Sequence, residues 1–157
     1  MPLMECESAV KPGASSQKSQ SYPRTGRLLR HADFERVYKQ GRRHFSAHMT
    51  VFYFGRTASL PLPTEPRASG VDQSHAGMRI GFTVSRALGG AVERNRMKRR
   101  LREAVRSCWP DSSAAVDIVV NPKKSLLRAD FAGLQAEVRR AFEVIELKLA
   151  AKAAPRR

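Results

Sequence analysis

The chain has 157 residues, enough for one modest domain, and its 29 Lys and Arg residues against 14 Asp and Glu residues give a formal charge of +15. This excess is beyond what solubility needs and favours a polyanionic partner, above all nucleic acid. No stretch approaches the roughly 18 apolar residues of a membrane span and no secretory signal is evident, so a cytoplasmic protein without a membrane partner is expected.

Composition divides the chain into three regions. Residues 1–26 are rich in Ser, Gln, Lys, Pro and Gly and show no apolar period, which predicts a disordered basic N-terminal arm. Residues 27–149 are expected to form a single RNA-binding domain, and 150–157 a frayed basic C-terminus. Two cysteines, Cys6 in the arm and Cys108 on an apolar helix face, suggest neither a disulfide framework nor a metal site.

The first half of the domain is predicted to contain one helix and one strand. The helix covers 29–40 and ends at Gly41, because three side chains share one of its faces: Phe34, Val37 and Tyr38. The strand covers 49–54, which is rich in β-branched and aromatic residues, and an extra strand is expected near 44–49 or inside the next loop. That loop, 55–77, contains several prolines and no apolar period, so it is expected to be long and flexible.

The second half is predicted to alternate strands and helices. Strands are expected over 78–85 and 116–120, and helices over 91–108 and 129–151, where apolar residues recur at steps of three and four. Helices separated by short strands indicate an α/β fold in which the helices pack on one sheet.

The helix at 91–108 is the most informative segment, because it combines an apolar face with seven basic residues and only two glutamates. One face can pack on a core while the rest presents guanidinium groups to phosphates. A merely solvated face is one alternative. An anionic membrane surface is another, but the apolar face carries no Trp or Phe to enter a bilayer interface.

The start of this helix, AVERNRMKRRLR, resembles the signature of the protein subunit of bacterial ribonuclease P. The family shows a small residue, then Arg-Asn-Arg, an aliphatic residue, a basic residue, Arg and a further basic position, here Ala91, Arg94, Asn95, Arg96, Met97, Lys98, Arg99 and Arg102. The strand RIGFTVSR before it, the first helix and the segment DIVV are also similar to the family. The resemblance covers roughly residues 27–149.

The resemblance implies an α/β (α+β) two-layer sandwich, ribosomal protein S5 domain 2-like, with the basic helix in a left-handed β-α-β crossover. It also implies the protein subunit of ribonuclease P, which binds the catalytic RNA and the 5′ leader of precursor tRNA and promotes endonucleolytic removal of that leader. The RNA component would carry catalysis, and Mg²⁺ would act through the RNA subunit and bound RNA. No catalytic residue, protein metal site or small-molecule cofactor is therefore expected in this chain.

Two sets of site residues follow. Binding of the catalytic RNA is assigned to Arg94, Asn95, Arg96, Lys98, Arg99, Arg102 and Arg106. The arginines of the motif are expected to contact phosphates, whereas Asn95 is expected to fix the helix entry or to contact a base or ribose. The cleft for the single-stranded leader is assigned to Phe34, Tyr38, Phe52, Tyr53, Phe54 and Ser85. Strand alternation puts Tyr53 on the face opposite to Phe52 and Phe54, and which face meets the leader stays open. Plain roles also stay open: an N-terminal cap for Asn95, a core anchor for Phe34, and ordinary helix-start acids for Asp33 and Glu35, otherwise candidates for a hydrated Mg²⁺.

The alternative function is a ribosomal or ribosome-assembly RNA-binding protein, because basicity, size and fold suit it equally. Only the ordered motif separates the two hypotheses. A protein nuclease acting alone would need clustered carboxylates or a base beside a nucleophile, and no histidine is predicted to pair with a nucleophile.

Overall fold

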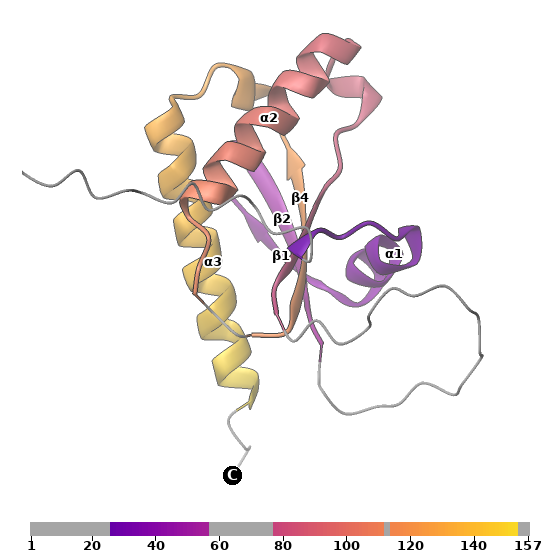
Figure 1. Cartoon of the computed structure of the whole chain (residues 1–157), viewed down its shortest axis with the longest axis vertical. Helices are drawn as coiled ribbons and strands as arrows, with labels where there is room; N and C mark the ends of the chain where they lie inside the picture. The colour runs from indigo at the N-terminus through magenta and orange to yellow at the C-terminus, as the bar shows by residue number, and fades with distance from the viewer. Residues whose placement is uncertain (1–25, 57–76, 112–113, 154–157) are drawn as a thin grey trace, which may run out of the picture.

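Four strands form one sheet in the order β1-β2-β4-β3 in the computed structural model, which describes residues 26–56, 77–111 and 114–153 (Figure 1). The strands are β1 (Arg42–Phe45), β2 (Met49–Gly55), β3 (Arg79–Phe82) and β4 (Val116–Pro122). β1 is the extra strand expected near 44–49, and it begins two residues earlier. The predicted arm and most of the predicted loop lie outside the described residues.

Three helices and two short 3₁₀ turns complete the described chain. They are α1 (His31–Gln40), η2 (Arg86–Leu88), α2 (Ala91–Ser107), η3 (Lys124–Leu127) and α3 (Phe131–Ala153). The predicted helices are confirmed, although α3 continues to Ala153, beyond the point where fraying was expected. No helix in the described ranges is both long and apolar enough to cross a membrane.

The strands pair in both directions. β2 is antiparallel to β1 and to β4, whereas β3 is parallel to β4. Parallel neighbours need a crossover connection, and α2 supplies it between β3 and β4, so the expected β-α-β unit is present. Its left-handed sense stays a prediction.

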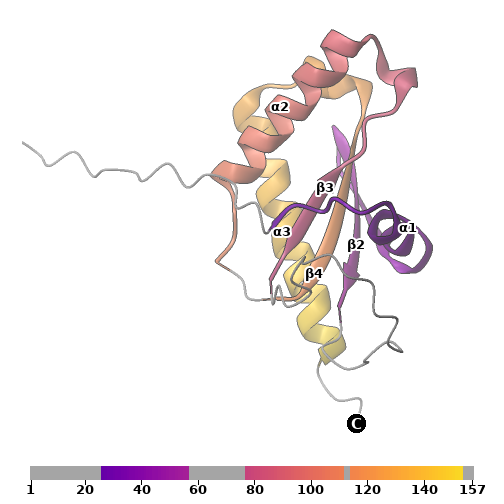
Figure 2. The same cartoon turned by 45° about the vertical axis from the view of Figure 1, so that its right-hand side comes forward.

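The main core lies between the sheet and the layer formed by α2 and α3. Side chains that alternate along β2 and β4 meet the apolar faces of these helices, and all are buried: Val51, Tyr53, Ile118, Val120, Met97, Leu101, Leu134 and Ile145. Figure 2 shows α2 and α3 on one side of the sheet and α1 on the other. The predicted two-layer architecture is confirmed, with α1 added across part of the second face.

A smaller apolar cluster holds α1 on that second face. Its buried members are Leu28, Val37 and Val119, with Phe34, Phe52 and Phe54 packed against them. Gly81 of β3 allows close approach, since a methyl group there would lie 2.5 Å from the ring of Phe34. At the outer edge of β3, Arg27 forms a parallel bridge with Ile80, while β1 is the outer strand on the other side.

Candidate nucleic-acid interface

α2 buries one face and exposes a basic stripe on the opposite side. Its buried residues are Met97, Leu101, Ala104 and Val105. At about 100° per residue, four exposed side chains fall within a sector of about 60° roughly opposite to them: Asn95, Arg99, Arg102 and Arg106. The polar face predicted from the sequence is therefore present on a rigid, docked helix.

Most basic side chains of α2 are not used inside the protein. Arg96, Lys98, Arg99 and Arg102 form no side-chain hydrogen bond or ion pair within the parts of the chain that the structure describes. Two others have local contacts: Arg94 Nε lies 3.4 Å from the carbonyl oxygen of Gly90, and Arg106 pairs with Glu103. Unpaired guanidinium groups side by side suit phosphate binding, because each offers a fork of N–H donors.

Arg100 differs from its neighbours because it is used internally. Its Nη1 donates to the carbonyl oxygens of Leu126 at 2.8 Å and Leu127 at 3.0 Å, and its Nη2 donates to that of Ala129. This guanidinium therefore ties α2 to η3 and to the segment between η3 and α3. Sequence analysis did not predict this role.

The helix begins at two glycines. Gly89 has φ of 142°, a conformation that disfavours any side chain, and Gly90 is the N-terminal cap residue, whose N–H donates to the Glu93 carboxylate at 3.0 Å. Asn95 lies in the second turn of the helix and is exposed. Its alternative role as the N-terminal cap is therefore wrong.

Aromatic rings gather where α1 meets the sheet, and we call Phe34, Tyr38, Phe52 and Phe54 the aromatic group. Tyr38 and Phe52 form an edge-to-face pair with ring centroids 4.9 Å apart. The Tyr38 hydroxyl donates to Asn121 Oδ1 on β4 at 2.9 Å, and the Arg43 guanidinium carbon lies 5.8 Å from the Phe52 centroid. A partly exposed ring beside an arginine and an amide can stack on an unpaired base and contact its phosphate.

The structure corrects one predicted member of this site and limits two others. Tyr53 is only 2% exposed and belongs to the core facing α2 and α3, because strand alternation turns it away from α1. Its assignment to the leader cleft is wrong. Phe34 is half-buried against Gly81, so it also anchors α1, and Ser85 lies beyond β3, where its hydroxyl accepts a hydrogen bond from the Ala87 N–H.

The acidic residues of α1 take different environments. Glu35 is exposed, whereas Asp33 is 7% exposed and its carboxylate contacts Arg79 and Arg36. Asp33 is therefore already neutralised by arginines, as an ordinary buried acid would be. In the three described ranges, no group of three or more His, Cys, Asp or Glu side chains is arranged to hold a metal ion.

His48 contacts other elements, and the surroundings of His44 shift its pKa. His48 Nδ1 lies 3.0 Å from Ser125 Oγ and its Nε2 lies 3.6 Å from Glu137 Oε1, two contacts that the sequence did not predict. These contacts join the connection between β1 and β2 to η3 and α3. On β1, burial and then the positive charges of Lys148 and Arg140 lower the pKa of His44.

Comparison with known proteins gives one consistent result. A profile of the family described as Ribonuclease P matches residues 22–146. The ribonuclease P protein component of Oleidesulfovibrio alaskensis is 39% identical over 103 residues, covering 66% of this chain and 70% of that protein. That of Paramagnetospirillum magneticum is 40% identical over 109 residues, covering 69% and 73%.

Solved structures agree in fold. The structure of the Staphylococcus aureus RNase P protein at 2.0 angstrom resembles this chain with a TM-score of 0.57 and 23% identity, covering 76% of this chain and 94% of that one. The RNase P protein from Thermotoga maritima gives a TM-score of 0.51 and 26% identity, covering 73% and 96%. Both likenesses support the α+β fold described above.

Proposed function

Because the chain belongs to the ribonuclease P family as its protein component, we propose that it binds ribonuclease P RNA through α2 and the 5′ leader of precursor tRNA through the aromatic group. In this proposal the RNA component holds the catalytic Mg²⁺ ions and hydrolyses the phosphodiester that joins the leader to the tRNA. The protein raises affinity for the substrate and contributes no catalytic residue. Its cytoplasmic location stays a prediction, and the ribosomal alternative is not favoured by the comparisons.

The observation that carries the proposal is the exposed basic stripe on α2. Arg99 and Arg102 stand on a helix whose other face is fixed in the core, so binding costs little additional ordering of the backbone. If each of the six basic residues assigned on α2 neutralises one phosphate, log K should fall against log salt with a slope of about −4 to −5. A salt-independent affinity would contradict this assignment.

The aromatic group supports the second half of the proposal. Tyr38 is 38% exposed and stands against Phe52, and base stacking on such rings is worth about 1–3 kcal/mol per base without sequence preference. Arg43 beside the Phe52 ring can reach a leader phosphate. Phe52 is thus the strand aromatic that we assign to the leader, together with Phe54 on the same face.

The first experiment measures precursor tRNA cleavage by a bacterial ribonuclease P RNA at low Mg²⁺, with and without this protein. Cleavage at the mature 5′ end that requires both components is expected. The double variant Arg99→Ala/Arg102→Ala should bind the RNA at least about tenfold more weakly and flatten the salt slope by about 2. Arg140→Ala is the matched control, because Arg140 is exposed on α3 near β1, and it should bind like the wild type.

The second experiment tests the leader site with two substitutions at one position. Tyr38→Ala in the assembled holoenzyme should weaken binding of precursor tRNA and leave mature tRNA binding nearly unchanged. Tyr38→Phe keeps the ring and loses only the hydrogen bond to Asn121, so it should retain most of the affinity. Equal losses for precursor and mature tRNA would argue against leader binding here.

A further inference from the structure

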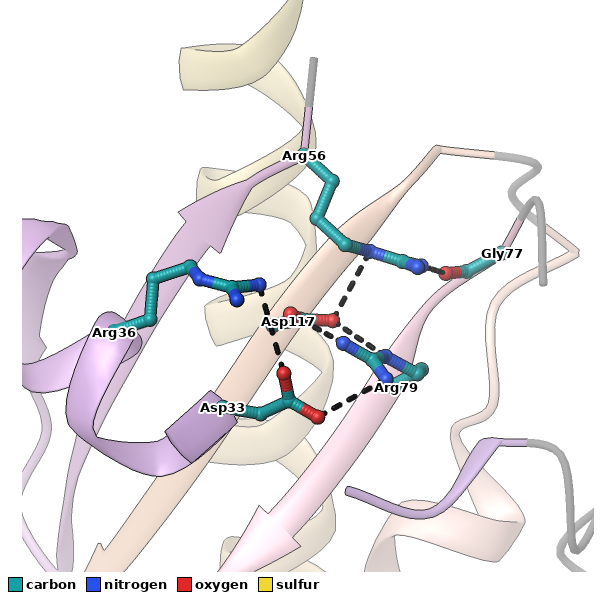
Figure 3. Close-up of polar contacts among 6 residues, drawn as sticks. All are labelled: Asp33, Arg36, Arg56, Gly77, Arg79 and Asp117. Carbon is teal, nitrogen blue, oxygen red and sulfur yellow. Dashed lines mark hydrogen bonds and ion pairs between the residues drawn. The ribbon is translucent and has the colours of Figure 1, made fainter. Parts of the chain in front are cut away.

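Five charged residues form a network that joins α1 to the sheet, as Figure 3 shows. Two carboxylates and three guanidinium groups meet on the face of the sheet that α1 covers: Asp33, Asp117, Arg36, Arg56 and Arg79. Asp117 is fully buried, and such a charge persists only when it is paired and hydrogen-bonded. None of these residues belongs to the RNA contacts proposed above.

Arg79 is the centre of the network because its guanidinium holds both carboxylates. Its Nε and Nη2 donate to Asp117 Oδ1 and Oδ2 at 2.8 Å and 2.7 Å, and its Nη1 donates to Asp33 Oδ2 at 3.3 Å. The hydrogen bonds to Asp117 are the largest of the causes that raise the pKa of Arg79. A planar fork fixes the relative position of two carboxylates, which a single ammonium group does not do.

The part of the network on the sheet is anchored independently of α1. Arg56 follows β2, and its Nε lies 3.1 Å from Asp117 Oδ1, while its Nη2 donates to the carbonyl oxygen of Gly77. Burial lowers the pKa of Arg56 more than the nearby Asp117 raises it. Three strands thus hold this part of the network in place, with Arg79 on β3, Asp117 on β4 and Arg56 directly after β2.

α1 contributes few fully buried side chains of its own to the contacts that hold it on the sheet. It has ten residues, no side-chain cap at its N-terminus, and only two buried side chains, Asp33 and Val37. A helix this short is not stable by itself, so its tertiary contacts fix where it lies. Asp33 is next to Phe34 and five residues before Tyr38, which places its ion pair at one end of the segment that carries the aromatic rings.

We propose that the Arg79–Asp33 contact is a positioning device that fixes α1 on the sheet and thereby holds Tyr38 against Phe52 in the arrangement that binds the leader. This inference rests on the proposed leader site and assigns to Asp33 and Arg79 a role in substrate selectivity without contact to RNA. Losing the contact frees the N-terminal end of α1, so the rings lose their fixed spacing although the fold persists.

The test measures the affinities of the reconstituted holoenzyme for precursor and mature tRNA and takes their ratio as selectivity. Asp33→Asn keeps the side-chain size and removes the charge, and it should lower selectivity at least about fivefold while mature tRNA affinity stays unchanged. Glu35→Gln is the matched control, since Glu35 is exposed on the same helix, and it should retain wild-type selectivity. Wild-type selectivity in Asp33→Asn would overturn the proposal.

A second variant covers the case in which Asp33→Asn fails to fold. Arg79→Lys leaves a cation beside Asp117 but removes the fork that reaches Asp33, so a folded Arg79→Lys protein should lose selectivity to a similar extent. Wild-type selectivity in that folded variant would also overturn the proposal. Circular dichroism melting of each free protein establishes that the variant is folded.

Combining substitutions separates this proposal from the one on which it rests. Asp33→Asn should lower selectivity little further in a Tyr38→Ala background, because both act through the same ring. Fully additive losses would mean that Asp33 acts elsewhere and would overturn the positioning role. If Tyr38→Ala alone leaves selectivity unchanged, the leader site itself is refuted, whereas an effect of Tyr38→Ala without one of Asp33→Asn refutes the positioning role only.

Discussion

Arg99 and Arg100 are neighbours on α2 whose side chains have different surroundings, and alanine substitutions should separate their roles. Arg99 is exposed and has no side-chain partner in the described part of the chain, whereas Arg100 donates to three backbone carbonyl oxygens of the η3 region. Arg99→Ala should therefore weaken RNA binding without affecting stability. Arg100→Ala should lower stability with little effect on RNA binding.

The expected size of each effect follows from the contacts. A hydrogen bond from a charged donor contributes about 1.5–3 kcal/mol when buried, and about 1 kcal/mol is reasonable for each bond of the half-buried Arg100. Three such bonds give a loss of about 3 kcal/mol in the free energy of unfolding. Removing the exposed Arg99 should change that free energy by no more than about 0.5 kcal/mol.

Urea unfolding followed by circular dichroism measures the first quantity, and RNA binding at several salt concentrations measures the second. Arg99→Ala should reduce the salt slope by about 1, as the loss of one phosphate contact requires. Arg100→Ala should keep the wild-type slope when measured where the protein is folded. Wild-type stability in Arg100→Ala, or a salt slope reduced as in Arg99→Ala, would refute the assignment of Arg100 to η3.

Three further substitutions test packing and titration. Gly81→Ala should lower the free energy of unfolding by about 1–3 kcal/mol in urea, because the added methyl group displaces the Phe34 ring; an unchanged value would contradict their close contact. Tyr53→Phe should raise the free energy of unfolding by about 1–2 kcal/mol, since the buried Tyr53 hydroxyl has no hydrogen-bond partner among the described residues. A lower free energy of unfolding would show that this hydroxyl is hydrogen-bonded. The lowered pKa of His44 means that the unfolded chain binds the proton more readily than the folded chain, so the free energy of unfolding should fall as the pH drops below about 6.5. His44→Gln should reduce the difference between the unfolding free energies measured at about pH 7.5 and about pH 5.5. An unchanged difference would exclude His44 as its source.

Local patterns were sufficient to predict most of the elements. The spacing of apolar residues in α2 and α3 and the composition of β2 and β4 are properties of residues close together in the chain, so the sequence shows these elements directly. β1 was predicted only as an extra strand of uncertain place. It has four residues, and its identity as a strand depends on pairing with β2, which no local pattern records.

The faces of β2 show where sequence reasoning stops. Alternation correctly placed Phe52 and Tyr53 on opposite faces of β2. Because both faces carry aromatic residues, the sequence did not show which face lies beneath α1 and which lies in the main core. The register decides it, because Phe52 pairs with Val119 beneath α1 while Tyr53 pairs with Ile118 in the main core. Helices pack on both faces of this sheet where β2 runs, so the polarity of its residues could not show which face is exposed.

One feature of the sequence could have predicted the charged network. Asp117 interrupts the apolar run VDIVV, and a lone acid in a buried strand implies a buried cation as its partner. The sequence does not show which cation this is, because Arg79 lies 38 residues away from Asp117 in the chain. The role of Arg100 was hidden for the same reason, because its acceptors lie 26 to 29 residues away.

The outer strands of the sheet bear on how the protein behaves at high concentration. An exposed strand edge offers unpaired N–H and C=O groups on which another chain can add and start aggregation. β1 has only four residues, two of which are the exposed Arg42 and Arg43, and like charges on two approaching copies repel each other. At the other edge, the segment before α1 contacts β3, since Arg27 bridges Ile80 and the Leu28 N–H donates to the Ile80 carbonyl oxygen at 3.0 Å. Each edge thus has a feature that hinders strand-to-strand association between copies, which lowers the tendency of the RNA-free protein to aggregate.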